Sequence, residues 1–137
     1  MPYTYQKPTD TGLYDIDDAL ELLTSSLPDL KQRWDKYICT GYSDYHLERM
    51  VFVDIFELSA YLMERYAKGD KGDFHMLFGT LEMILGNCTT VTENLLVFGL
   101  INDIQRGCKT NGFNCWTGFD KWLGPITKRK WDYLLSF

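Results

Sequence analysis

The segment that most constrains the fold is residues 45–68, YHLERMVFVDIFELSAYLMERYAK, which is apolar around most of a helical circumference. A helix of this kind needs neighbours on several sides, because water would otherwise face much of its apolar surface. A narrow polar line remains along it, formed by Asp54, Glu57, Tyr61, Glu64, Arg65 and Lys68. The segment therefore predicts a buried central helix within a bundle.

Further segments carry apolar residues at the three- and four-residue spacing of a helix, and they span residues 14–27, 26–39, 73–87, 92–105 and 122–135. The run LLVFGLI at 95–101 is short enough for a strand. A helix is favoured, because Thr90–Glu93 fits a capping box before it and the polar tail NDIQRG extends it. Pro125 after Gly124 suits the first turn of a last helix, with Trp131 facing inward.

The turns between these segments divide the chain. We expect an extended lead-in over residues 1–12 and a single helical domain over residues 13–137. The stretch 107–119, GCKTNGFNCWTGF, is rich in Gly and Asn and predicts the longest loop. No segment predicts a convincing strand, so we expect an all-α, single-domain bundle of six or seven helices with a buried central helix.

The net charge is −5, which disfavours general binding to nucleic acid or to an anionic membrane, because both require a basic surface. The acidity suits a basic partner, or it only aids solubility. No stretch approaches the roughly 18 apolar residues of a membrane span, and the polar start MPYTYQKPTDTG lacks a secretory pattern. We expect a cytoplasmic protein with free thiols and favour a monomer.

Catalytic and metal-binding patterns are not recognisable in the sequence. The two histidines and four cysteines have no neighbouring ligands at metal-binding spacing, so no metal and no cofactor are expected. Asp54 and Glu57 form an i,i+3 carboxylate pair, which would suit acid–base chemistry in a small hydrolase. A solvated stripe or an ion pair is the favoured interpretation, and we expect no enzyme.

Surface residues are the remaining candidates for function. One acidic patch is predicted from Asp15, Asp17, Asp18 and Glu21, and a second from Asp44, Glu48 and Asp54. Phe113, Trp116 and Phe119 lie in the Gly-rich loop. Aromatic residues in loops are common anchors at protein interfaces, but they can also fold back as a lid on the core. Both interpretations of this loop stay open.

Four motifs occur in a recognisable order along the chain. They are Leu27-Pro28-Asp29-Leu30, the segment Asp54 to Tyr61, the segment Asn94 to Ile104, and Leu123-Gly124-Pro125 with Trp131. In this order the sequence resembles a family of small helical bacterial proteins, many of unassigned function. They are similar to the immunity proteins encoded beside polymorphic toxins, including those of contact-dependent growth inhibition systems. The resemblance spans about residues 16–135.

The resemblance implies a cytosolic protein that binds one cognate toxin domain and blocks it. Such toxins are often nucleases with basic clefts, commonly RNases, and an acidic, aromatic-rich protein is physically suited to bind one. Candidate toxin-binding residues are Asp15, Asp17, Asp18, Glu21, Asp44, Glu48, Phe113 and Trp116. The alternative is a helical adaptor or regulatory subunit with another protein partner.

Overall fold

A computed structural model describes residues 12–42 and 50–137. Its helices are α1 (Ile16–Ser25), α2 (Pro28–Gly41), α3 (Val51–Asp54), α4 (Phe56–Ala67), α5 (Phe74–Leu85), α6 (Thr90–Asn94), the π-helix η1 (Leu95–Ile101), α7 (Asn102–Asn111), the 3₁₀-helix η2 (Asp120–Trp122) and α8 (Pro125–Leu135). A single residue separates α3 from α4, and α6, η1 and α7 form one continuous helix. The described residues thus form six main helices and no strand, which confirms the predicted all-α bundle.

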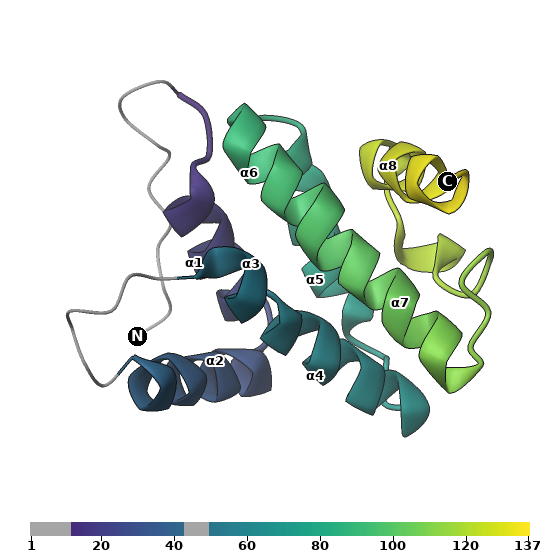
Figure 1. Ribbon diagram of the computed structural model, residues 1–137, viewed down its shortest axis with the longest axis horizontal. Coiled ribbons are helices and arrows are strands. Elements are labelled where there is room, and N and C mark those ends of the chain that lie inside the picture. Colours follow the sequence, from purple (N-terminus) through teal and green to yellow (C-terminus); the bar gives the residue numbers. More distant parts are fainter. Residues whose placement is uncertain (1–11, 43–49) are drawn as a thin grey trace.

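The continuous helix α6–η1–α7 crosses the molecule diagonally, with α4 beside its second half and α8 on the opposite side (Figure 1). Every residue of η1 except Phe98 is buried. The central helix is therefore this one, and the prediction that residues 45–68 would fill that place was wrong. Within that segment, residues 51–54 and 56–67 form α3 and α4, which leave Phe52 and Phe56 half exposed on the surface, and residues 45–49 lie outside the described residues.

Two glycines let α4 approach the long helix closely. A Cβ atom added to Gly107 would lie 2.7 Å from Cγ of Met63, and one added to Gly99 would lie 3.2 Å from Cγ2 of Ile55. A larger residue at Gly107 would push against the Met63 side chain. The close packing of α4 on η1 and α7 therefore depends on small residues at these two positions.

The start of α8 is held by a carboxylate from α5. Glu82 accepts hydrogen bonds from the backbone nitrogens of Ile126 (3.0 Å) and Thr127 (2.8 Å) and from the Thr127 hydroxyl (2.8 Å). Burial alone would raise the pKa of Glu82, but the hydrogen bonds from Thr127 and Ile126 outweigh it and lower the pKa. A Cβ atom on Gly124 would lie 2.5 Å from Cδ of Glu82, so glycine leaves room for this cap. Pro125 occupies the first turn as predicted.

Aromatic rings pack together beneath α8 in what we call the aromatic cluster. Its members are Tyr66, Phe74, Phe78, Phe113, Phe119, Trp122 and Trp131. Trp131 is fully buried, as the sequence predicts, and its indole nitrogen donates to the carbonyl oxygen of Cys115 at 2.9 Å. The cluster thus buries large rings while pairing the one polar atom of Trp131.

Two helix boundaries differ from the sequence-based prediction. Thr89, and not Thr90, caps α6, since its hydroxyl oxygen accepts a hydrogen bond from the Thr92 nitrogen at 3.2 Å. The long helix also continues to Asn111, so the loop begins at Gly112 and not at residue 107. Gly112 has φ of 72°, the left-handed conformation that favours glycine at the end of a helix.

Candidate functional site

The predicted acidic patch on α1 is partly engaged in folding. Asp15 and Asp18 form a reciprocal capping box: the Asp15 side chain accepts from the Asp18 nitrogen at 2.8 Å, and the Asp18 side chain accepts from the Asp15 nitrogen at 3.1 Å. Glu21 pairs with Lys31 at 3.1 Å. Asp17 is exposed in the first turn of α1. We call these four residues the α1 patch, and Asp17 is the exposed carboxylate that takes no part in the capping box.

The second predicted acidic patch cannot be placed as a unit. Asp44 and Glu48 lie outside the described residues. Asp54 is buried and accepts hydrogen bonds from the hydroxyls of Tyr37 (2.8 Å) and Tyr42 (2.6 Å). Burial, together with the hydrogen bond to Asp54, raises the pKa of Tyr37 to about 12.

The carboxylates of Asp54 and Glu57 have separate partners. Glu57 accepts from Arg33 at 2.8 Å, and the same guanidinium contacts Glu64 at 2.8 Å. The ion-pair interpretation is therefore correct for Glu57, while the solvated stripe is wrong for Asp54. The tyrosines that hold Asp54 come from α2 and the residue after it, which the spacing within residues 45–68 does not reveal.

The loop after α7 divides its aromatic residues between core and surface. The Phe113 ring lies 4.7 Å from the Tyr66 ring, and Phe119 is buried in the aromatic cluster. The side chain of Trp116 is 62% exposed. The lid interpretation thus describes Phe113 and Phe119, and Trp116 remains the candidate anchor in this loop.

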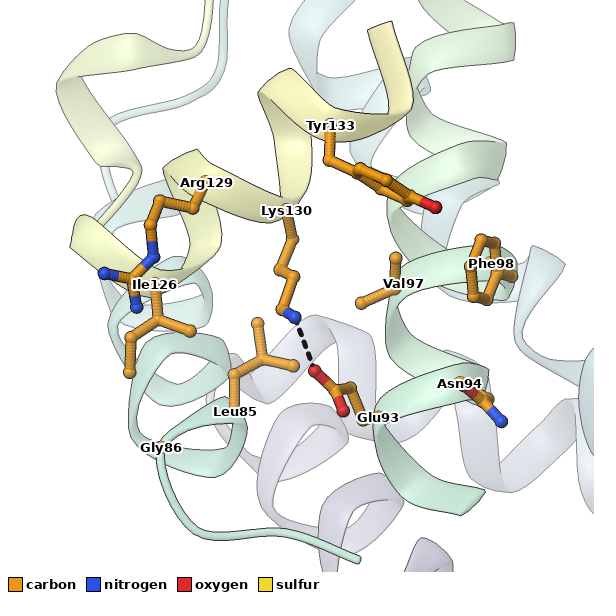
Figure 2. A pocket seen from close by; sticks show the side chains of 10 residues that line it. All are labelled: Leu85, Gly86, Glu93, Asn94, Val97, Phe98, Ile126, Arg129, Lys130 and Tyr133. Carbon is orange, nitrogen blue, oxygen red and sulfur yellow. Dashed lines mark ion pairs between the residues drawn. The ribbon is translucent and has the colours of Figure 1, made fainter. Parts of the chain in front are cut away.

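A groove opens between α8, the end of α5 and the first part of the long helix (Figure 2). We call it the α8 groove, and its volume is about 660 Å³, within the range of about 300–1,000 Å³ typical of ligand sites. Leu85, Val97 and Ile126 give it an apolar lining. Lys130 and Glu93 form an ion pair at 2.6 Å. The groove can bind an apolar group, and its central charges already neutralise each other.

An exposed apolar surface, which we call the α3 face, consists of Met50, Phe52, Val53, Phe56 and Phe98, and each of these side chains is 49–61% exposed. A Cβ atom on Gly99 would lie 3.5 Å from Cδ1 of Phe52, so the Phe52 ring adjoins the part of η1 that carries Phe98. Contiguous exposed apolar residues mark interaction surfaces more often than isolated ones do. The segment 45–68 indicated such a face in the sequence. It is apolar around most of its circumference, and the neighbouring helices cover only part of that apolar surface.

Reactive groups are dispersed through the described part of the chain. No three His, Cys, Asp or Glu side chains there are close enough to hold a metal ion. Cys108 is buried, and burial raises the pKa of its thiol to about 12, so it is a poor nucleophile. Cys39 is exposed and Cys88 half-buried, and all four cysteines are free. Across residues 12–42 and 50–137, no helix combines the length and apolar character needed to cross a bilayer.

Comparison with known proteins places most of the chain in one family. The family described as "Domain of unknown function (DUF7674)" matches residues 20–136. A search of curated proteins and a search of solved structures each found no match. The matched region covers every helix except the first turn of α1, so the family corresponds to the helical bundle itself.

Proposed function

This chain belongs to the DUF7674 family, and we propose that it is an immunity protein that binds and neutralises a cognate bacterial toxin domain. It acts in the cytoplasm as a monomeric binding protein and not as an enzyme. The toxin is a basic nuclease, commonly an RNase in such systems. The observation that carries the proposal is the α3 face, because half-exposed aromatic rings gathered on one surface favour a protein partner.

Charge and resemblance support the choice of a toxin as that partner. The net charge of −5 complements a basic nuclease cleft, and opposite charge accelerates the association of two proteins. The motifs from Leu27 to Trp131 resemble those of immunity proteins. Asp17 and Trp116 are exposed members of the predicted toxin-binding set that do not form the capping box of α1, and each can contact a partner without disturbing the core.

Co-expression with the toxin domain encoded beside the gene tests the proposal. Cells that carry the toxin domain should survive when this protein is present, and the two purified proteins should form a complex at or below micromolar concentration. Equal killing with and without the protein, together with no complex at that concentration, would contradict the proposal.

A charge reversal tests whether the α1 patch faces the toxin. Asp17→Lys is the suitable variant, because reversing Asp15 or Asp18 would also remove the capping box of α1. If the patch contributes, association should slow and its dependence on salt should weaken, while thermal stability falls only slightly, because a lysine replaces an acidic residue in the first turn of α1. Unchanged association kinetics would exclude Asp17 from the interface.

A helical adaptor or regulatory subunit is the second candidate function, and the same α3 face supports it. The two candidates differ in the identity of the partner. Isolation of a complex from cells of origin, followed by mass spectrometry of the bound protein, separates them: a toxin encoded in the same gene cluster supports immunity, and a protein from an unrelated operon supports the adaptor.

A further inference from the structure

A small groove lies between α4 and α7, beside the α3 face, where the two helices run side by side (Figure 1). We call it the α4–α7 groove, and its volume is about 260 Å³. That is below the range of about 300–1,000 Å³ for drug-sized ligands, so the groove is suited to one side chain. Its apolar walls come from Phe56, Ala60 and Met63 on α4. Gly107 on α7 forms part of the lining and leaves space for Met63.

A single carboxylate, that of Asp103, lines this groove, and its side chain is only 13% exposed. The nearest cation is Arg106, which also lines the groove and lies 3.7 Å from Asp103, and its side chain is 72% exposed. Burial raises the pKa of Asp103, and the charge of Arg106 lowers it by less. The negative charge of Asp103 is therefore only partly compensated within the chain.

The α8 groove provides an internal contrast. There Lys130 lies 2.6 Å from Glu93, so cation and anion are already in direct contact. In the α4–α7 groove the corresponding distance is longer by about 1 Å, and the arginine is mostly in water. An incoming cation would therefore gain more from Asp103 than from Glu93.

The lining selects the shape of the incoming group. A lysine or arginine side chain has an aliphatic stem that packs on apolar surface and a charged head that stays polar. Phe56, Ala60 and Met63 offer the apolar surface, and Asp103 offers the counter-charge. The α3 face continues from Phe56, so a partner seated there would bring its side chains to the groove.

We infer that the α4–α7 groove receives one lysine or arginine side chain of the toxin domain, with the stem against Phe56 and Met63 and the charged head at Asp103. This assignment rests on the proposed function, because it takes the basic toxin as its partner. It places the interface on the α3 face and the adjoining groove. The α1 patch then contributes to long-range attraction and not to the closest contacts.

The test compares the variants Asp103→Asn and Ala60→Leu with the wild type. The binding partner is the toxin domain encoded beside the gene, and the association and dissociation rates of the complex are measured. The first variant removes the charge at constant shape, and the second fills the groove at constant charge. Each should weaken the complex by at least about 30-fold, chiefly through faster dissociation. Asp132→Asn on α8 is the matched control, since its carboxylate is 56% exposed and lies outside the groove.

The outcomes separate this assignment from the proposed function. Thermal unfolding establishes that each variant is folded, and Asp103→Asn is expected to fold because an amide replaces a buried charge with little change in volume. If the wild type forms the complex and both variants dissociate as slowly as it does, the groove assignment is overturned and the immunity function stands. The same holds if Asp103→Asn slows only association. If the wild type forms no complex, the proposed function and this assignment both fail.

Discussion

The aromatic cluster and the α3 face both contain phenylalanine rings, and the two regions have opposite surroundings. In the cluster, the rings of Phe119 and Trp131 lie 5.3 Å apart, and both side chains are at most 1% exposed. On the α3 face, Phe52 and Phe56 are 51% and 58% exposed. Aromatic content therefore predicts neither stability nor binding by itself. The difference is whether neighbouring elements cover the ring, which the structure decides.

The polar groups of the two regions also differ in how far they are paired within the chain. Below α8, Trp131 and Glu82 have partners within the chain, and Glu82 alone accepts three hydrogen bonds. Beside the α3 face, Asp103 has one ion-pair partner, the mostly exposed Arg106, at 3.7 Å. The first region is complete in the isolated protein. In the interface proposed above, the second region acquires a further partner.

The largest effect on stability is expected from Trp131→Ala. This change leaves a cavity in the aromatic cluster and removes the donor to the carbonyl of Cys115, so the free energy of unfolding should fall by about 3–5 kcal/mol. Urea denaturation followed by circular dichroism measures it. Trp116→Ala is the control, with an expected change within about 0.5 kcal/mol, because that ring is 62% exposed. Similar losses of stability in the two variants would contradict the assignment of Trp131 to the core and of Trp116 to the surface.

A smaller loss of about 1.5–3 kcal/mol is expected from Asp54→Ala, which removes the charged acceptor for the hydroxyls of Tyr37 and Tyr42. Asp54 is the last residue of α3, so this variant tests whether its hydrogen bonds to the two tyrosines hold α3 in position. Denaturation of Asp54→Ala and of Tyr37→Phe measures the effect. The tyrosine variant should lose less, since it removes one hydrogen bond and keeps the other. No loss in either would show that α3 is positioned by its apolar contacts alone.

Glu82→Gln tests the cap of α8 and should cost about 1–2 kcal/mol at neutral pH. Because the folded protein lowers the pKa of Glu82 from its ordinary 4.5, the charged cap stabilises the fold above that pH. This contribution is lost as the pH falls below 4.5 through the lowered value. Stability curves of wild type and variant should therefore converge in acid.

The control for this cap is Glu93→Gln, which breaks only the partly exposed pair with Lys130 and should cost about 0–1 kcal/mol. A constant difference between wild type and Glu82→Gln from neutral pH to pH 3 would argue against an ionised cap.

The smallest effect on stability is expected on the α3 face. Phe52→Ser and Phe56→Ser should each lower the free energy of unfolding by no more than about 1 kcal/mol, because about half of each side chain already faces water. The double variant should nevertheless weaken the toxin complex by about tenfold or more. It should also bind less of a hydrophobic dye. A large loss of stability would show that these rings belong to the core, and the α3 face would then not differ from the aromatic cluster in its role.

Local sequence predicted those parts of the fold whose signals lie within one helix. Apolar spacing predicted the helices, and the Gly124-Pro125 step predicted the start of α8 with Trp131 inward. The reason that position 124 is glycine could not be predicted, because Glu82 is 42 residues earlier in the chain. Local sequence also could not show which helix is the most buried. LLVFGLI lies at the centre because α4 packs against it, and α4 is formed by a distant segment of the chain.

The candidate site was less predictable than the fold, because its members are defined by distant partners. Phe113 and Trp116 share a loop and a residue class, yet only Phe113 meets the ring of Tyr66. Asp103 belongs to the polar tail NDIQRG, which indicated only the extent of a helix. Its burial follows from contact between α4 and α7, and no local pattern encodes that contact.

The π-helix η1 accommodates one extra residue in the middle of the long helix. Its backbone bonds reach one residue further than in an α-helix, as in the bond from the Asn102 nitrogen to the Val97 carbonyl. A π-turn holds one residue more than an α-turn, so deleting one residue within Leu95–Ile101 would let this stretch close into a regular α-helix. The faces of α6 and α7 would then keep their present directions, and Glu93 and Asp103 would still line their two grooves. The length of this stretch can therefore change by one residue without a change in the surface chemistry on either side.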